Sequence, residues 1–317
     1  NVVGLCAYLT ESTKMEAFAK KYPDRFVEIG VAEQNLAAVA SGMAAAGKVP
    51  FISSYAMFSP GRNWEQIRTT ICYNERHVII AGSHAGVSVG PDGATHQAIE
   101  DIAIMRPIAN MRVIAPCDIH EARKTTIAAA KLPGPVYIRL GREKTPICTT
   151  TETPFEIGKA YEVWRPEGSQ PKVDGSPSMD STSSPQASSG RLKPQAVLIA
   201  CGSLVHNAIL AASELEKDDI PVSVINNHTI KPMDEETIIT VAKEAGAVVT
   251  VEEHQVMGGM GSAVAEVLAR NYPVPIEFVG VENRFGESGE PGELVEKFGM
   301  GVSSIVMAVK KVVQRKI

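Results

Sequence analysis

Short β-branched and apolar runs alternate with helical patterns along most of the chain. The runs predict strands at residues 27–29, 49–52, 77–80, 112–114 and 136–138, and again at 196–200, 222–225, 247–251 and 276–279. In the first half, helical patterns fill the intervals at 33–46, 63–74, 96–105 and 120–131. Such alternation predicts parallel sheets covered by helices on both faces. We therefore predict an α/β fold with two doubly wound, mostly parallel-sheet domains.

Residues 166–194 interrupt this rhythm. Pro, Gly and Ser occupy 16 of the 29 positions, and the sizeable apolar side chains are only Val173, Met179 and Leu192. Such a segment buries too little surface to offset its ordering entropy. We predict a flexible linker at 166–194 between domains at 1–165 and 195–317, with a docking or regulatory segment as the alternative.

Length and composition exclude several classes of protein. The chain has 317 residues, 44% of them hydrophobic and 21% charged, with a formal net charge of -5. This length suits two domains. Nucleic-acid binders usually carry a basic patch, so we expect no nucleic-acid partner, while small anionic substrates remain compatible with a few arginines in one cleft.

Cysteine usage and the absence of targeting patterns bear on localisation. The five cysteines lie far apart without a CxxC pair, which fits neither a disulfide framework nor a zinc site. The Ala-rich stretch at 36–47 is too short to span a membrane. No charged-then-apolar leader follows Asn1. We expect a soluble cytoplasmic protein.

Residues 28–35, with the sequence EIGVAEQN, place Glu33 between a predicted strand and an Ala-rich helix. Taken alone, a carboxylate there is explained by the helix dipole. The whole string, however, closely resembles the G-x-A-E-Q-N segment of the pyrimidine-binding domain of the transketolase family. The resemblance implies that Glu33 hydrogen-bonds the aminopyrimidine ring of thiamine diphosphate and is a catalytic acid–base group.

The aromatic residues of segment 51–58, FISSYAMF, are the next match. Aromatic residues after a strand most often belong to the core. In transketolases the matching positions stack on the aminopyrimidine, so the resemblance makes Tyr55 and Phe58 cofactor-binding residues. Arg62 follows in a register lengthened by one residue, and by the same resemblance it binds the sugar phosphate.

The glycine-rich segment 82–96, GSHAGVSVGPDGATH, is the most specific motif. A Pro-Asp-Gly triplet is ordinarily a turn. Two histidines and an aspartate in this loop resemble the transketolase substrate loop, where His84 would approach the phosphate and Asp92 the donor's hydroxyl. His96 would contact the oxygen that changes charge during carbon–carbon cleavage. Glycines allow backbone to approach a ligand closely.

Two further residues match anion-binding positions of the family. Arg142 ends the segment YIRLGR, and a guanidinium fork matches phosphate oxygens. Ser12 matches a serine on the same phosphate. Their ordinary alternatives are a solvated surface charge and a helix cap. Tyr8 departs from the family, which commonly has an aspartate there beside the cofactor.

Segments of the second half match the transketolase carboxyl-terminal domain in order and spacing: 229–234, 251–254, 258–261 and 284–289. The glycines of 258–261 do not satisfy the G-x-G-x-x-G pattern of a dinucleotide loop. We interpret His254 as a structural or interface residue and assign no chemistry to this domain.

The G-D-G…N stretch that holds the cofactor's diphosphate and a divalent metal in full-length transketolases is missing from this sequence. The chain resembles the carboxyl-terminal subunit of split transketolases, which implies an amino-terminal partner subunit that supplies the Mg²⁺ ligands, and an α2β2 assembly. A truncated longer protein is equally compatible. The implied reaction moves a two-carbon ketol unit between sugar phosphates, as in the pentose phosphate pathway.

Three rival interpretations remain. The β subunit of a 2-oxoacid dehydrogenase shares the pyrimidine domain but has no use for Asp92, His96 and Arg142. Deoxyxylulose-phosphate synthase fits the segments ending at Arg142 and Pro232 less well. A non-catalytic α/β partner is kept open by Tyr8.

Overall fold

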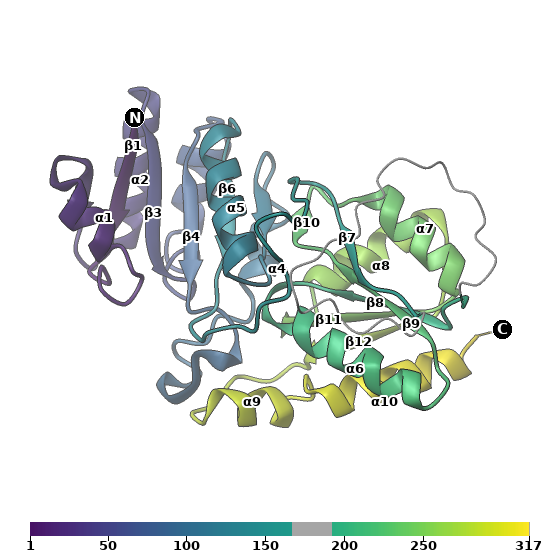
Figure 1. Cartoon of the computed structure of the whole chain (residues 1–317). Coiled ribbons are helices and arrows are strands. Elements are labelled where there is room, and N and C mark those ends of the chain that lie inside the picture. Colours follow the sequence, from purple (N-terminus) through teal and green to yellow (C-terminus); the bar gives the residue numbers. More distant parts are fainter. Residues whose placement is uncertain (167–191, 317) are drawn as a thin grey trace.

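The computed structural model describes residues 1–166 and 192–316, so the predicted linker lies almost wholly outside the described residues. The described part of the chain forms two sheets that lie next to each other (Figure 1). Both sheets are mostly parallel and covered by helices, which confirms the predicted α/β fold class. No helix in the described ranges is long and apolar enough to span a bilayer.

The first sheet has seven strands within the described residues, and the segments 28–35, 51–58 and 82–96 each begin in one of its strands. Its strands, in spatial order, are β10 (Thr229–Lys231), β5 (Arg112–Ile114), β6 (Val136–Arg139), β4 (Ile79–Ser83), β3 (Val49–Tyr55), β1 (Val2–Cys6) and β2 (Phe26–Glu28). All neighbours pair in parallel except β10 and β5. The carboxyl ends of β1, β3, β4 and β6 therefore meet at one edge.

Side chains alternate between the two faces of this sheet, as a period of two requires. Ile80 packs in the larger core with Leu36 of α2 (Glu33–Ala45), whereas Ile79 packs in a smaller cluster with Ala129 of α5 (Ile119–Lys131). The remaining helical segments of this part are α1 (Glu16–Lys21), η1 (Pro23–Arg25), α3 (Trp64–Gln66), the π-helical η2 (Ile67–Cys72), the 3₁₀ segment η3 (Val87–Asp92) and α4 (Asp101–Met105).

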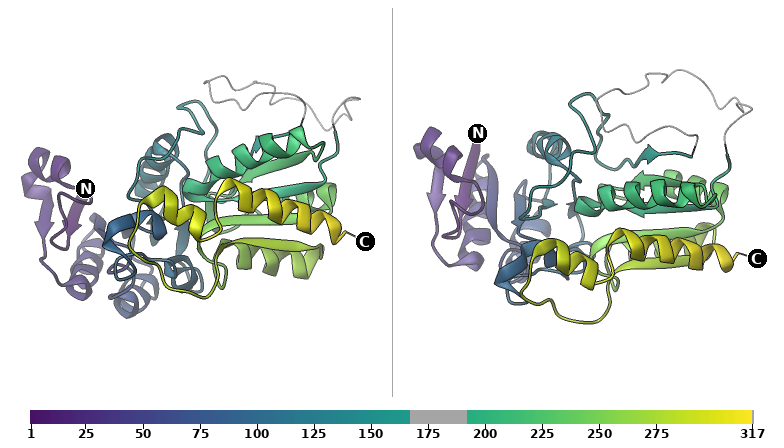
Figure 2. Two further views of the ribbon diagram at one scale, coloured as in Figure 1. Left: turned by 90° about the horizontal axis from the view of Figure 1, so that it is seen from below. Right: turned by 60° about the horizontal axis from the view of Figure 1, so that its bottom comes forward.

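The second sheet has five strands in the described ranges, ordered β12 (Ile276–Val281), β11 (Val248–Gln255), β8 (Ala196–Ala200), β9 (Val222–Asn226) and β7 (Tyr161–Trp164). Helices α6 (Val205–Lys217) and α10 (Val302–Gln314) pack together on one face, and α7 (Glu235–Ala245) and α8 (Met260–Asn271) on the other (Figures 1 and 2). The short segments are η4 (Gly202–Leu204) and α9 (Pro291–Lys297).

The two halves of the chain exchange strands. β7 precedes the predicted linker yet pairs antiparallel with β9 of the second sheet, and β10 follows the linker yet pairs antiparallel with β5 of the first. A single apolar cluster contains residues of both sheets, such as Ile80 and Ile199. The two domains therefore share this cluster, while other apolar clusters lie beside it.

Two predicted helices differ from the structure. The segment predicted at 63–74 is α-helical only over Trp64–Gln66 and continues as a π-helix, a form found frequently at functional sites. The segment predicted at 96–105 becomes helical only at Asp101. Gln97 lies before this helix because its amide bonds the carbonyls of Val87, Gly90 and Glu287.

Candidate functional site

The residues predicted from the sequence gather at the carboxyl edge of the first sheet. Tyr55 ends β3, His84 follows β4 and Arg142 follows β6, and these three strands are neighbours. Parallel strands all end at the same edge, where ligands bind in open α/β sheets. The structure thus brings together side chains that are far apart in the sequence.

Four rings form one cluster at this edge. Tyr55 stacks on His84 with ring centroids 3.9 Å apart, and it lies nearly parallel to Phe58 at 6.1 Å. His96 meets Phe58 edge-on at 5.4 Å and Tyr55 at 6.2 Å. Tyr55, Phe58 and His96 are only partly buried. The cluster therefore offers aromatic faces and ring nitrogens to a ligand.

His84 is held in a constrained form. Its backbone is left-handed, with a φ of 56°, and its Nδ1 lies 2.6 Å from the Ser83 hydroxyl. Burial, followed by the charge of Arg142, lowers the pKa of His84 to about 4. At neutral pH the ring is therefore uncharged, so it can serve a ligand as a hydrogen-bond donor rather than as a cation.

Glu33 is the first residue of α2, and its carboxylate lies in the interior. Its side chain is 2% exposed and its Oε2 accepts a hydrogen bond from Nη1 of Arg62 at 2.7 Å. The Asn63 amide binds the Glu33 carbonyl at 2.9 Å. Among the described residues the carboxylate accepts no hydrogen bond from a helix N–H, so only the field of the helix dipole, and no capping bond, links it to α2.

In the structure Arg62 therefore forms an ion pair with Glu33. Its guanidinium also lies over the Phe58 ring, 4.8 Å from the centroid. Arg142 has a different environment: its Nη1 donates to the Val89 carbonyl at 2.5 Å and lies 3.7 Å from Oδ2 of Asp92. Two arginines that the sequence analysis assigned to one phosphate thus pair with different carboxylates.

The loop after β1 carries Ser12 and Tyr8. Ser12 is exposed and is not the cap of α1, because that position belongs to Met15. Lys14, two residues further, lies near enough to His84 for its charge to contribute to the lowered pKa of His84. Tyr8 is 73% exposed with a φ of 68°, and its N–H donates to Oε1 of Glu28 at 2.6 Å.

The glycines of the loop at 82–96 face the carboxyl-terminal domain. A Cβ on Gly86 would lie 2.2 Å from the Glu253 carboxylate, one on Gly93 would lie 2.7 Å from the Ser288 hydroxyl, and one on Gly90 would lie 3.1 Å from Pro291. All three glycines have positive φ. The sequence interpretation linked these glycines to the approach of a ligand, whereas the structure shows close packing of the second domain.

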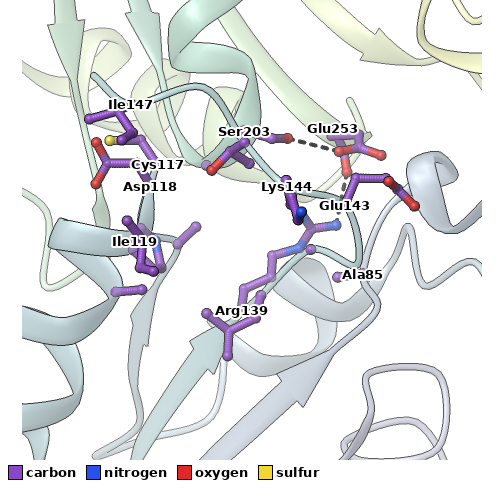
Figure 3. A pocket seen from close by; sticks show the side chains of 17 residues that line it. Ala85, Cys117, Asp118, Ile119, Arg139, Glu143, Lys144, Ile147, Ser203 and Glu253 are labelled. Carbon is purple, nitrogen blue, oxygen red and sulfur yellow. Dashed lines mark hydrogen bonds between the residues drawn. The ribbon is translucent and has the colours of Figure 1, made fainter. Parts of the chain in front are cut away.

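An interdomain pocket of about 390 Å³ is lined by Ala85 of this loop and by residues of both domains (Figure 3). Lys144 and Glu143 of the segment 141–147 line it, and so do Ser203 and Glu253 of the second domain. A second pocket of about 340 Å³ shares these four residues. The pockets border the segment that carries Arg142, while Arg142 itself turns toward Val89 and Asp92.

Sequence reasoning missed several residues that position the site. Asn63 and Glu253 are buried and bind backbone of the site segments, and Lys14 adds charge near His84. Glu253 lies in the matched segment 251–254, but no local pattern indicates what these residues do, because each acts through a contact distant in the chain. No group of three or more His, Cys, Asp or Glu side chains in residues 1–166 and 192–316 is placed to hold a metal ion.

The segment 258–261 likewise has a structural explanation. The carboxylate of Glu252 accepts hydrogen bonds from the N–H groups of Met260 at 2.6 Å and Gly261 at 2.8 Å. A Cβ on Gly259 would lie 2.3 Å from this carboxylate. The amino terminus of α8 is thus occupied by a side chain of the protein itself.

Comparison with known proteins gives two family matches. Residues 1–147 match the transketolase pyrimidine-binding domain, and residues 186–305 match the transketolase C-terminal domain. The chain is 39% identical over 319 residues to a protein of Methanocaldococcus jannaschii described as a transketolase C-terminal section, covering 100% of this chain and 92% of that protein.

Two further matches span nearly the whole chain. A 6-deoxy-6-sulfo-D-fructose transketolase subunit of Clostridium sp. (strain MSTE9) is 36% identical, covering 99% of this chain and 89% of that protein. A solved structure described as the inactive β4 tetramer of a split-gene transketolase superposes with a TM-score of 0.84 at 40% identity, covering 100% of this chain and 93% of that one.

Proposed function

This chain belongs to the transketolase family, and we propose that it is the carboxyl-terminal subunit of a thiamine-diphosphate-dependent transketolase. The proposed reaction moves a two-carbon ketol unit from a ketose phosphate to an aldose phosphate. The observation that carries the proposal is the buried Glu33 carboxylate beside an aromatic and histidine cluster at the carboxyl edge of the first sheet. An acid–base group and a stacking surface lie together there.

The residues at this edge fit the aminopyrimidine end of the cofactor. The Glu33 side chain is 2% exposed, and its Oε1 has no hydrogen-bond partner among the described residues, so it can accept a hydrogen bond from a protonated ring nitrogen. Tyr55 and Phe58 are partly exposed, nearly parallel rings, and aromatic stacking contributes about 0.5–1.5 kcal/mol beyond area burial. When bound, the cofactor supplies the reactive carbon and the electron sink that carbon–carbon cleavage requires.

The substrate side of the proposal rests on the polar groups around the rings. His84, uncharged at neutral pH, and Arg142 would donate hydrogen bonds to the sugar phosphate. Ser12 lies exposed in the loop after β1 and would join them at the phosphate. Asp92 would accept a hydrogen bond from the donor's hydroxyl, and His96 would exchange a proton with the oxygen that changes charge during cleavage.

The proposed assembly includes an amino-terminal subunit that holds the diphosphate and Mg²⁺, in an α2β2 complex. The similarity to a transketolase subunit and to a split-gene transketolase described as an inactive β4 tetramer supports a separate amino-terminal partner. A magnesium ion held by phosphates also needs one or two protein carboxylates, which the partner would provide. All five cysteines are free, which supports a reducing, cytoplasmic location.

The test is reconstitution. The amino-terminal subunit would be sought by pull-down with this chain and identified by its G-D-G…N stretch, and donor turnover would be measured with thiamine diphosphate and Mg²⁺. We expect the chain alone to be inactive and the complex to be active. Glu33→Ala should keep its fold, checked by circular dichroism, and lower kcat by about 10²–10⁴-fold. Near-normal turnover by Glu33→Ala would refute the role of Glu33.

A further inference from the structure

The arginine that the sequence analysis assigned to the sugar phosphate lies on the acid–base group instead. Arg62 donates to Oε2 of Glu33 at 2.7 Å, and among the described residues it has no other ion-pair partner. The Arg62 side chain is 49% exposed, whereas that of Glu33 is 2% exposed. Burying a carboxylate without a compensating partner is costly, so the guanidinium of Arg62 supplies the positive charge that compensates the buried Glu33 carboxylate.

The turn before α3 is built to present this guanidinium. Arg62 N–H donates to the Phe58 carbonyl at 2.9 Å, and a Cβ on Gly61 would lie only 2.0 Å from the Met57 carbonyl oxygen. Glycine is therefore required at position 61. The next residue, Asn63, is buried and binds the Glu33 carbonyl, so neighbouring residues hold the side chain and the main chain of Glu33.

The Phe58 ring fixes the other side of the guanidinium. The guanidinium carbon of Arg62 lies 4.8 Å from the ring centroid, a distance typical of a cation–π contact. Phe58 is also one of the two rings proposed to stack on the aminopyrimidine. Arg62 thus connects the stacking surface to the acid–base group, and it binds one carboxylate oxygen while Oε1 stays open.

We propose that Arg62 is a positioning residue for Glu33, which holds the carboxylate in the rotamer that presents Oε1 to the cofactor, and that it is not a ligand of the substrate phosphate. This inference rests on the proposed function. Misplacing a reacting group by about 1 Å can cost on the order of 10²-fold in rate. Losing Arg62 should therefore slow the turnover of every donor, whether or not the donor carries a phosphate.

The experiment compares Arg62→Met with Arg142→Met in the reconstituted complex, using xylulose 5-phosphate and unphosphorylated hydroxypyruvate as donors. Arg62→Met should lower kcat by about 10–100-fold for both donors. Arg62→Lys, which keeps the charge but not the fork, should recover part of the loss. Arg142→Met should chiefly raise KM for xylulose 5-phosphate. A rise in KM confined to xylulose 5-phosphate in Arg62→Met, or wild-type kinetics, would overturn the inference.

A second measurement separates positioning from a general structural role. The Kd of thiamine diphosphate for the complex would be followed by its near-ultraviolet circular dichroism band in wild type, Arg62→Met, Glu33→Gln and the double variant. The effect of Arg62→Met should shrink to within about twofold once Glu33 is Gln, because coupled residues are not additive. Equal effects in both backgrounds would contradict the inference. Absence of turnover in the wild-type complex would instead contradict the proposed function.

Discussion

Replacing Arg139 should lower the free energy of unfolding more than replacing Arg62, Arg112 or Arg142. Arg139 ends β6 and is 8% exposed, and its Nε donates to Oδ2 of Asp101 at 2.9 Å. Its Nη2 also donates to the carbonyls of Ala98 at 3.2 Å and Glu253 at 2.8 Å. The Asp101 carboxylate is itself buried, and its Oδ1 has no hydrogen-bond partner in the part of the chain that the structure describes.

Arg139→Met removes this charge partner and leaves Asp101 buried with a hydrogen bond from Tyr137. Breaking a buried ion pair in this way costs about 3–5 kcal/mol, a large part of the roughly 5–15 kcal/mol that stabilises a typical domain. Urea unfolding would measure the loss. The second variant, Arg139→Met with Asp101→Asn, should recover part of it, because no charge is then left unpaired.

The matched control is Arg112 of the neighbouring strand β5, which donates to the Pro133 carbonyl at the surface. Arg112→Met should cost less than about 1 kcal/mol, as exposed polar contacts usually do. If Arg139→Met cost no more than Arg112→Met, the argument from buried charge would be refuted.

The pH dependence of stability and the need for glycine at position 61 can be tested in the same way. Burial lowers the pKa of His254 from 6.5 to about 4, and its Nε2 accepts from the N–H of Ile102 at 3.1 Å. Between these pH values the unfolded chain therefore binds one proton more than the folded chain. The free energy of unfolding of wild type should rise relative to that of His254→Gln, by up to about 3 kcal/mol, as the pH rises from about 4 to 6.5. A difference between the two proteins that does not change with pH would contradict this. Gly61→Ala should destabilise the fold by about 1–3 kcal/mol, because its Cβ would lie 2.0 Å from a carbonyl oxygen. The control is Gly42→Ala inside α2, whose Cβ meets no atom within 4 Å. It should stabilise the fold by about 0.5–1 kcal/mol in the same urea assay.

Most of the fold could be predicted from hydrophobic periodicity, because the parallel strands are short apolar runs buried on both faces. β5 appears at the predicted residues 112–114, and β8 at 196–200. The exchanged strands β7 and β10 were not predicted, since their pairing partners lie on the other side of the linker. β-Sheet pairing over such a separation depends on tertiary packing, which local patterns do not encode.

Some features of the candidate site could likewise be predicted from the sequence, and others could not. Tyr55, Phe58, His84 and His96 could be found because each belongs to a contiguous motif, and the structure places their rings in one cluster. The partner of Arg62 could not be found. The motif gives the residue type, but the direction of its side chain follows from the turn that Gly61 permits.

The carboxyl-terminal domain, to which sequence reasoning assigned no chemistry, holds the loop at 82–96 in place. Glu253 accepts hydrogen bonds from the Ser88 N–H at 2.7 Å and the Ser203 hydroxyl at 2.9 Å, and its carbonyl accepts from Arg139. Gly86 leaves room for this carboxylate. η3, which begins one residue later and ends at Asp92, packs on α9 of the second domain. Buried, hydrogen-bonded contacts fix the positions of neighbouring groups, so the geometry of Asp92 and His96 depends on contacts with the second domain.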